Sequence, residues 1–134
     1  MIGVLIVTHG DIGTSLLTSA SQILGGEQKQ VATLSVWRAD EVDDLVLRAR
    51  ELMESLDSGD GVLVLTDIFG ATPGNVVSRL LEDGRIEGVS GASLPMLLRV
   101  LTGRNGSLSA AVQRALSGGA EGVVHMNNDR CCDA

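Results

Sequence analysis

The stretch Ile2–Gly13 reads IGVLIVTHGDIG, an apolar run that stops at Thr8-His9 and is followed by glycine. A short, continuous apolar run bounded by a turn signal is typical of a strand that is buried on both faces of a sheet. We therefore predict a first strand over residues 2–8, with His9 at its carboxyl end. In open α/β sheets ligands bind at this end, so His9 is the first candidate for a functional residue.

The rest of the chain alternates apolar runs with helical patterns, which predicts βαβ units and a parallel sheet. We expect further strands at residues 31–36, 61–66, 85–91 and 121–126, and helices around residues 16–24, 42–56, 72–84, 94–103 and 107–116. Asp40 and Thr72 are expected to cap the helices that follow them. The predicted fold is α/β and doubly wound, with a mainly parallel central sheet of order 2-1-3-4 and helices on both faces.

Length and composition fit one domain, because 134 residues with 44% hydrophobic content can bury a full core. We assign residues 1–128 to this domain and residues 129–134 to a flexible C-terminal tail. The formal net charge of −7 opposes binding to nucleic acid. The chain opens on a strand without a basic segment, and no apolar run approaches ~18 residues, so we expect a cytoplasmic location.

Cofactor and metal motifs are missing from the sequence. The G-x-G-x-x-G pattern of dinucleotide sites is absent. His125, Cys131, Cys132 and Asp133 lie close together near the end of the chain, but their spacing matches no familiar zinc pattern. We therefore expect neither a cofactor nor a metal, and we expect His125 to be a packed or interface residue.

Polar residues follow two of the predicted strands: Thr8-His9-Gly10 after the first and Thr66-Asp67 after the third. These strands are neighbours in a 2-1-3 order, so we expect His9 and Asp67 to meet. A carboxylate on one imidazole nitrogen fixes the tautomer and leaves the other nitrogen as a nucleophile. It also stabilises a cationic or phosphorylated ring. A lone strand-end histidine is more often structural, but the aspartate loop and the helix start favour a functional role.

An anion fits beside this pair. Gly10 and Gly13 bracket the entry to the first helix, and Thr72 opens another, and helix N-termini bind phosphate through free N–H groups. Thr66 and Thr72 offer hydroxyl groups. Neither loop contains lysine or arginine, and Arg38, after the second strand, is the nearest candidate cation.

Three segments of the chain carry a family resemblance: VLIVTHGDIG (4–13), VLVLTDIFGATPGN (62–75) and GVSGASLPMLL (88–98). In order and spacing they resemble the mannose-type enzyme IIA component of the bacterial sugar phosphotransferase system. The resemblance implies that His9 accepts a phosphoryl group from the phosphohistidine carrier protein HPr. It then passes the group to a histidine of an enzyme IIB protein, which phosphorylates sugar during uptake. Contact with a membrane permease would be peripheral at most.

The resemblance also implies roles for the residues around His9. Asp67 matches the family's aspartate after the third strand, and Gly70 and Thr72 match residues around the following helix start. The predicted catalytic residues are therefore His9 and Asp67. The predicted phosphate-binding residues, from the two arguments together, are Gly10, Thr66, Gly70 and Thr72.

The family fold implies a homodimer that exchanges its last, antiparallel strand, here residues 121–126. Many members continue into an enzyme IIB domain, whereas this chain stops soon after that segment. Either the IIB partner is a separate protein, or His9 phosphorylation is a regulatory signal to another protein. The phosphotransferase subunit of dihydroxyacetone kinase shares the early histidine, yet residues 66–75 resemble the sugar branch more closely. A receiver-type response regulator is disfavoured, because its acidic cluster and lysine are missing.

Overall fold

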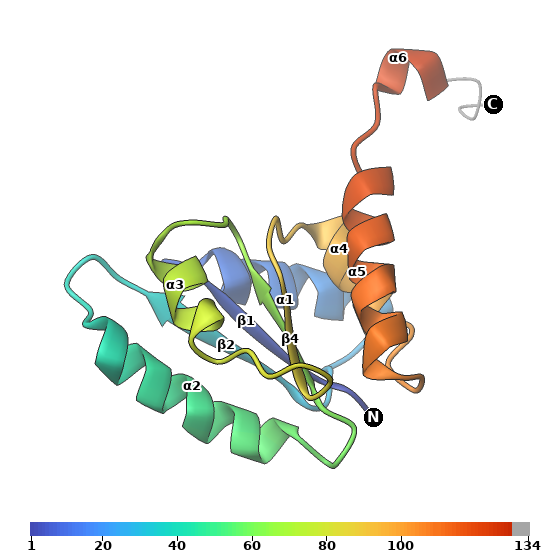
Figure 1. Cartoon of the computed structure of the whole chain (residues 1–134). Helices are drawn as coiled ribbons and strands as arrows, with labels where there is room; N and C mark the ends of the chain where they lie inside the picture. The colour runs from blue at the N-terminus through green and yellow to red at the C-terminus, as the bar shows by residue number, and fades with distance from the viewer. Residues whose placement is uncertain (130–134) are drawn as a thin grey trace.

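A computed structural model describes residues 1–129 of the chain. In chain order the elements are β1 (Gly3–His9), α1 (Ile12–Leu24), β2 (Val31–Val36), α2 (Val42–Leu56), β3 (Val62–Thr66), α3 (Thr72–Ser78), β4 (Ile86–Val89), α4 (Leu94–Leu101), α5 (Leu108–Glu121) and α6 (Met126–Asp129). The strands form one parallel sheet of order β2-β1-β3-β4 (Figure 1). The predicted α/β fold class and the strand order are confirmed.

The two central strands place the ends of two apolar runs side by side. β1 is buried up to Thr8, and β3 is buried along its whole length. Their register pairs Val7 with Thr66, and on the other side of β1 the register pairs His9 with Val36 of β2. The residues that follow β1, β2 and β3 therefore emerge at the same edge of the sheet.

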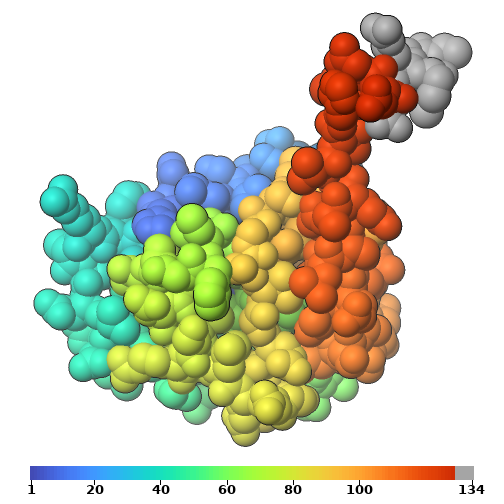
Figure 2. All heavy atoms as spheres, turned by 45° about the horizontal axis from the view of Figure 1, so that its top comes forward, coloured from blue at the N-terminus to red at the C-terminus, as the bar shows by residue number. Residues whose placement is uncertain are grey.

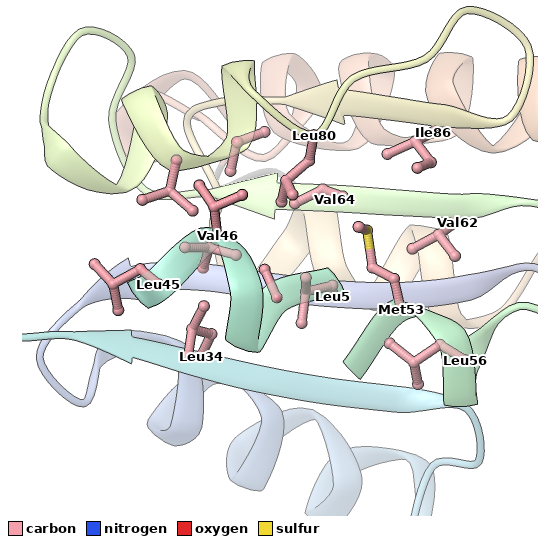
Figure 3. Close-up of a cluster of buried hydrophobic side chains, with 14 of the residues drawn as sticks. Leu5, Leu34, Leu45, Val46, Met53, Leu56, Val62, Val64, Leu80 and Ile86 are labelled. Carbon is pink, nitrogen blue, oxygen red and sulfur yellow. The ribbon is translucent and has the colours of Figure 1, made fainter. Parts of the chain in front are cut away.

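Helices cover both faces of the sheet. One face packs against α2 and α3, where Leu5, Leu34, Val62 and Val64 meet residues such as Leu45, Val46, Met53, Leu56 and Leu80 (Figure 3). The opposite face packs against α1, α4 and α5, and its core includes Ile2, Val4, Ile6, Leu63, Leu65, Met96, Leu97, Val100 and Ala111. Strand residues alternate between the two cores, which explains why β1 and β3 are apolar without interruption.

Two predicted helix caps are wrong. Asp40 does not cap α2: its carboxylate accepts a hydrogen bond from Trp37 N at 2.8 Å, and the cap position is Glu41 without a side-chain bond. Thr72 is the first residue of α3 rather than its cap. Serine hydroxyls cap two later helices instead: Ser93 accepts from Met96 N, and Ser107 accepts from Ala110 N.

The predicted strand at 121–126 is also wrong for the single chain. α5 runs through Glu121, and an irregular segment and the short α6 follow it. The helix extends past residue 116 because Gly118 is buried closely against Met96 and Arg99 of α4, so the helix packs on α4 beyond that point. Beyond α5 the chain leaves the body of the molecule (Figure 2), and the side chain of Val123 is 85% exposed. The predicted tail lies outside the described residues from residue 130 onward.

Candidate functional site

His9 and Asp67 meet at the carboxyl edge of the sheet, although 58 residues separate them in sequence. Asp67 Oδ2 lies 2.9 Å from His9 Nδ1 and accepts a second hydrogen bond from His9 N at 3.1 Å. The side chain of Asp67 is only 12% exposed, whereas that of His9 is 50% exposed. The carboxylate is therefore a fixed, mostly buried partner, and the ring presents its other edge to solvent.

Asp67 is held in place and kept ionised. Its other oxygen, Oδ1, accepts from Ile68 N at 3.1 Å and lies 3.5 Å from the hydroxyl of Thr66. Burial acts to raise the pKa of the Asp67 carboxyl, but the hydrogen bonds from the ring and the amide of His9, together with its charge, outweigh burial and lower the pKa below its ordinary value. An ionised carboxylate can only accept hydrogen bonds, so the proton of the neutral ring resides on Nδ1. The Nε2 lone pair is then free to act as a nucleophile.

His9 opens onto a cavity of about 270 Å³. The cavity is lined by His9, Val36, Trp37, Arg38, Asp40 and Thr72. Its walls thus come from the carboxyl ends of β1 and β2 and from the start of α3. A group bound to His9 in this cavity would meet a hydroxyl, a guanidinium and an aromatic ring.

The predicted phosphate-binding residues differ in their positions. Thr72 lines the cavity with His9, and Gly70 lies in the loop before it with a positive φ of 86°. Thr66 is buried behind Asp67, where its hydroxyl faces the carboxylate. The amide of Gly10 is already occupied, because it donates to the carbonyl of Val36 at 2.9 Å. Among the four, Thr72 and Gly70 are therefore the residues whose position best suits an anion.

Sequence reasoning missed two residues that shape the site. The buried hydroxyl of Thr8 accepts a 2.7 Å hydrogen bond from Gly13 N and so fixes the first turn of α1 relative to His9. Trp37 packs on the turn after β1: a Cβ added to Gly10 would lie 3.3 Å from its ring. The contact between Thr8 and Gly13 joins residues only five positions apart, so the sequence could have indicated it. The tryptophan contact crosses between strands, so local sequence carried no sign of it.

Residues that bind metals or cross membranes are the remaining candidates for function. Within residues 1–129, no group of three His, Cys, Asp or Glu side chains is arranged to hold a metal ion. His125 is exposed rather than packed, and Cys131, Cys132 and Asp133 lie outside the described residues. In the same described part of the chain, no helix is both long and apolar enough to cross a membrane.

Known proteins match both the sequence and the fold. Residues 3–116 match the family described as PTS system fructose IIA component. Over 125 residues the chain is 33% identical to the PTS system mannose-specific EIIAB component of Escherichia coli strain K12, covering 91% of this chain and 38% of that protein. Over 103 residues it is 33% identical to the PTS system fructose-specific EIIA component of Bacillus subtilis strain 168, covering 76% of this chain and 70% of that protein.

A solved structure supports the same assignment. The phosphotransferase system component EIIA from Streptococcus agalactiae superposes with a TM-score of 0.84 at 27% identity, over 96% of this chain and 99% of that chain. The chain thus belongs to a class of parallel α/β domains that carry a histidine and an aspartate at the ends of adjacent strands. The chain is a member of the PTS system fructose IIA component family, so the predicted resemblance is confirmed. Components of this kind are phosphotransferase-type proteins.

Proposed function

We propose that the protein is a phosphohistidine carrier of the sugar phosphotransferase system, with His9 as the phosphorylated residue. The observation that carries this proposal is the 2.9 Å contact between His9 Nδ1 and Asp67, combined with the half-exposed ring. Because Asp67 occupies Nδ1, Nε2 is the ring nitrogen that remains available as the nucleophile. Asp67 also stabilises the positive charge that the ring acquires during transfer.

The proposed reaction exchanges one phosphorus–nitrogen bond for another. His9 Nε2 attacks the phosphorus of phospho-HPr in line, and the bond between phosphorus and the donor imidazole breaks with its electron pair returning to that imidazole. The phosphoryl group next moves from His9 to a histidine of an enzyme IIB protein by the same exchange. No metal or cofactor enters either step.

The phosphoryl group is proposed to rest between His9 and the start of α3. The amides of Gly70, Ala71 and Thr72 donate no hydrogen bond within residues 1–129, and the side chain of Thr72 lines the cavity. Amides and a hydroxyl at this position suit the oxygens of a phosphoryl group. Thr66 contributes indirectly by its contact with Asp67, and Gly10 by setting the turn after His9.

Partner proteins are proposed to dock around this cavity. Ile68 and Phe69, which directly follow Asp67, are exposed, and Phe69 is 79% exposed. Large apolar side chains in this position fit a protein surface better than solvent. HPr and the IIB protein each need to approach His9 closely. The exposed side chains of Ile68 and Phe69 would contact each partner in turn.

A homodimer is proposed to form by exchange of the segment after α5. Within residues 1–129, β4 is an edge strand whose outer side pairs with no other strand, and Val123, Val124 and Met126 are exposed on a segment that leaves the body of the molecule (Figure 1). An extended segment from a second copy fits such an edge as an additional antiparallel strand. The exposed side chains would then be buried between the two copies.

Phosphorylation with purified components tests the function. The protein is incubated with phosphoenolpyruvate, enzyme I and HPr, and its intact mass is measured. We expect one acid-labile phosphoryl group on the wild type and on His125→Ala, and none on His9→Ala. Since the chain has only two histidines, His125→Ala is the matched control.

Two results of this experiment would contradict the proposal: no adduct on the wild type, or an adduct that persists in His9→Ala. Addition of a candidate IIB protein tests the second step. We expect rapid loss of the adduct to a cognate IIB protein. Persistence of the adduct with every candidate would favour the regulatory role over sugar transport.

A further inference from the structure

The turn between β2 and α2 is closed by hydrogen bonds at both ends. The carboxylate of Asp40 accepts from Trp37 N at 2.8 Å, and Asp40 N donates to Trp37 O at 3.0 Å. Arg38 lies inside this closed turn. Its backbone is therefore held in one position, although its side chain is exposed.

The same turn is joined to the turn that carries His9. Gly10 N donates to Val36 O at 2.9 Å, directly before Trp37, and the ring of Trp37 lies over Gly10. Gly10 adopts a positive φ of 50° there. The wall formed by residues 37–40 is thus fixed relative to the imidazole.

Charge distinguishes this wall from the rest of the cavity. Its charged side chains are Arg38 and Asp40, and the carboxylate of Asp40 already accepts a hydrogen bond from Trp37 N. Arg38 forms no ion pair with any residue in the described part of the chain. Phosphorylation adds a charge of about −1.5 to −2 together with three acceptor oxygens. Within residues 1–129, Arg38 is therefore a cation without an ion-pair partner that lines the same cavity as His9, which receives this anion.

We propose that Arg38 is a phosphoryl-binding residue, whose guanidinium donates hydrogen bonds to the phosphoryl group on His9 Nε2 while Trp37 covers the group from the side of Gly10. This proposal rests on the function proposed above. Arg38 takes no part in bond making or breaking. Its N–H groups neutralise charge that grows as the phosphoryl group is transferred, and a guanidinium suits this task because its planar fork matches phosphate oxygens.

A small phosphoryl donor tests Arg38 without any contribution from protein docking. Phosphoramidate transfers its phosphoryl group to His9 Nε2 with breakage of its own P–N bond and release of ammonia. The rate of adduct formation is measured by intact mass for the wild type, Arg38→Gln, Arg38→Lys and Arg48→Gln. The last variant is the matched control, because Arg48 is exposed on α2 and forms no ion pair within residues 1–129.

We expect Arg38→Gln to react about tenfold more slowly than the wild type, since a charge-assisted hydrogen bond is lost. Arg38→Lys is expected to recover much of the rate, and Arg48→Gln to match the wild type. The effect of Arg38→Gln should shrink at high salt, because ions screen the lost charge, and a purely structural role would not respond in this way. The same fold-change is expected with phospho-HPr as the donor.

Several outcomes would overturn the proposal. Equal rates for Arg38→Gln and the wild type would do so, as would a defect seen with phospho-HPr but not with phosphoramidate, which would place Arg38 in docking. Emission from Trp37, the only tryptophan, reports whether the turn is intact. If emission shifts in Arg38→Gln and Arg38→Lys recovers nothing, the role is structural. A wild type that accepts no phosphoryl group from either donor would instead refute the function itself.

Discussion

At the scale of single residues, the chemistry depends on one carboxylate that is held more firmly than the imidazole it serves. Asp67 is bound by the amides of His9 and Ile68 as well as by the ring. These bonds orient the carboxylate before any substrate arrives, so the tautomer of His9 is set in the resting protein. Adjacent strand ends were enough to predict this pair from the sequence, because parallel order alone brings the residues together.

Asp67→Asn is expected to keep the fold and slow the phosphorylation of His9 by phospho-HPr about 10²-fold or more. The single amide oxygen can accept from only one of the two backbone amides, those of His9 and Ile68, and the side chain no longer carries the charge that stabilises the ring. Rates are measured by rapid quench and intact mass, with circular dichroism to verify the fold. A variant that transfers at the wild-type rate would remove the orienting role of Asp67.

Gly10 is a second residue on which the site depends. Its φ of 50° and the nearby ring of Trp37 both oppose a side chain. Gly10→Ala is expected to lower the free energy of unfolding by about 1–2 kcal/mol and to shift the emission of Trp37. Gly25→Ala is the control, because Gly25 has a φ of 83° but nothing within 4 Å of an added Cβ. An unchanged Trp37 spectrum in Gly10→Ala would contradict the packing described here.

At the scale of elements, the four strands of the sheet were predicted closely, whereas the helix ends were not. The strand predicted at residues 31–36 is β2, whereas Asp40 and Thr72 do not cap as expected. Apolar periodicity reports burial against a sheet, which the whole element shares. A helix cap depends on which of several nearby amides donates its hydrogen bond to a single hydroxyl or carboxylate. Asp40 bonds to Trp37 N instead of the helix, and that choice closes the turn beside the site.

Ser107 provides a test of a cap that does form. Its hydroxyl accepts from Ala110 N at 3.1 Å at the start of α5. Ser107→Ala should lower the free energy of unfolding by about 1 kcal/mol in urea titration, because one amide of the first turn loses its partner. Ser109→Ala, two residues on and exposed, should leave stability nearly unchanged. Equal effects of the two substitutions would show that the cap contributes nothing.

At the scale of the whole molecule, the segment after α5 is the part that a single chain leaves unexplained. Its apolar pattern predicted a strand at 121–126, yet no neighbouring strand reaches it within the described chain. The apolar pattern indicates that this segment prefers to be buried. A single sequence does not say whether it is buried against its own chain or against a second copy of the protein. Val123, Val124 and Met126 therefore remain exposed here.

The exchange proposed for this segment predicts a dimer that depends on its backbone. Val124→Pro removes an N–H from the proposed strand and should shift the protein toward monomer in sedimentation velocity, without loss of the core fold. Val124→Thr keeps a β-branched side chain and the amide, and it should remain a dimer. A wild type that sediments as a monomer at high concentration would rule out the exchange.

The central claim is that Asp67 holds Nδ1 of His9, so that Nε2 receives the phosphoryl group. The most direct test is NMR spectroscopy of the phosphorylated protein labelled with ¹⁵N in its histidine rings, in which the phosphorus–nitrogen coupling identifies the modified nitrogen. We predict that Nε2 of His9 shows this coupling and that His125 shows none. Coupling at Nδ1 of His9, or at either nitrogen of His125, would contradict the account.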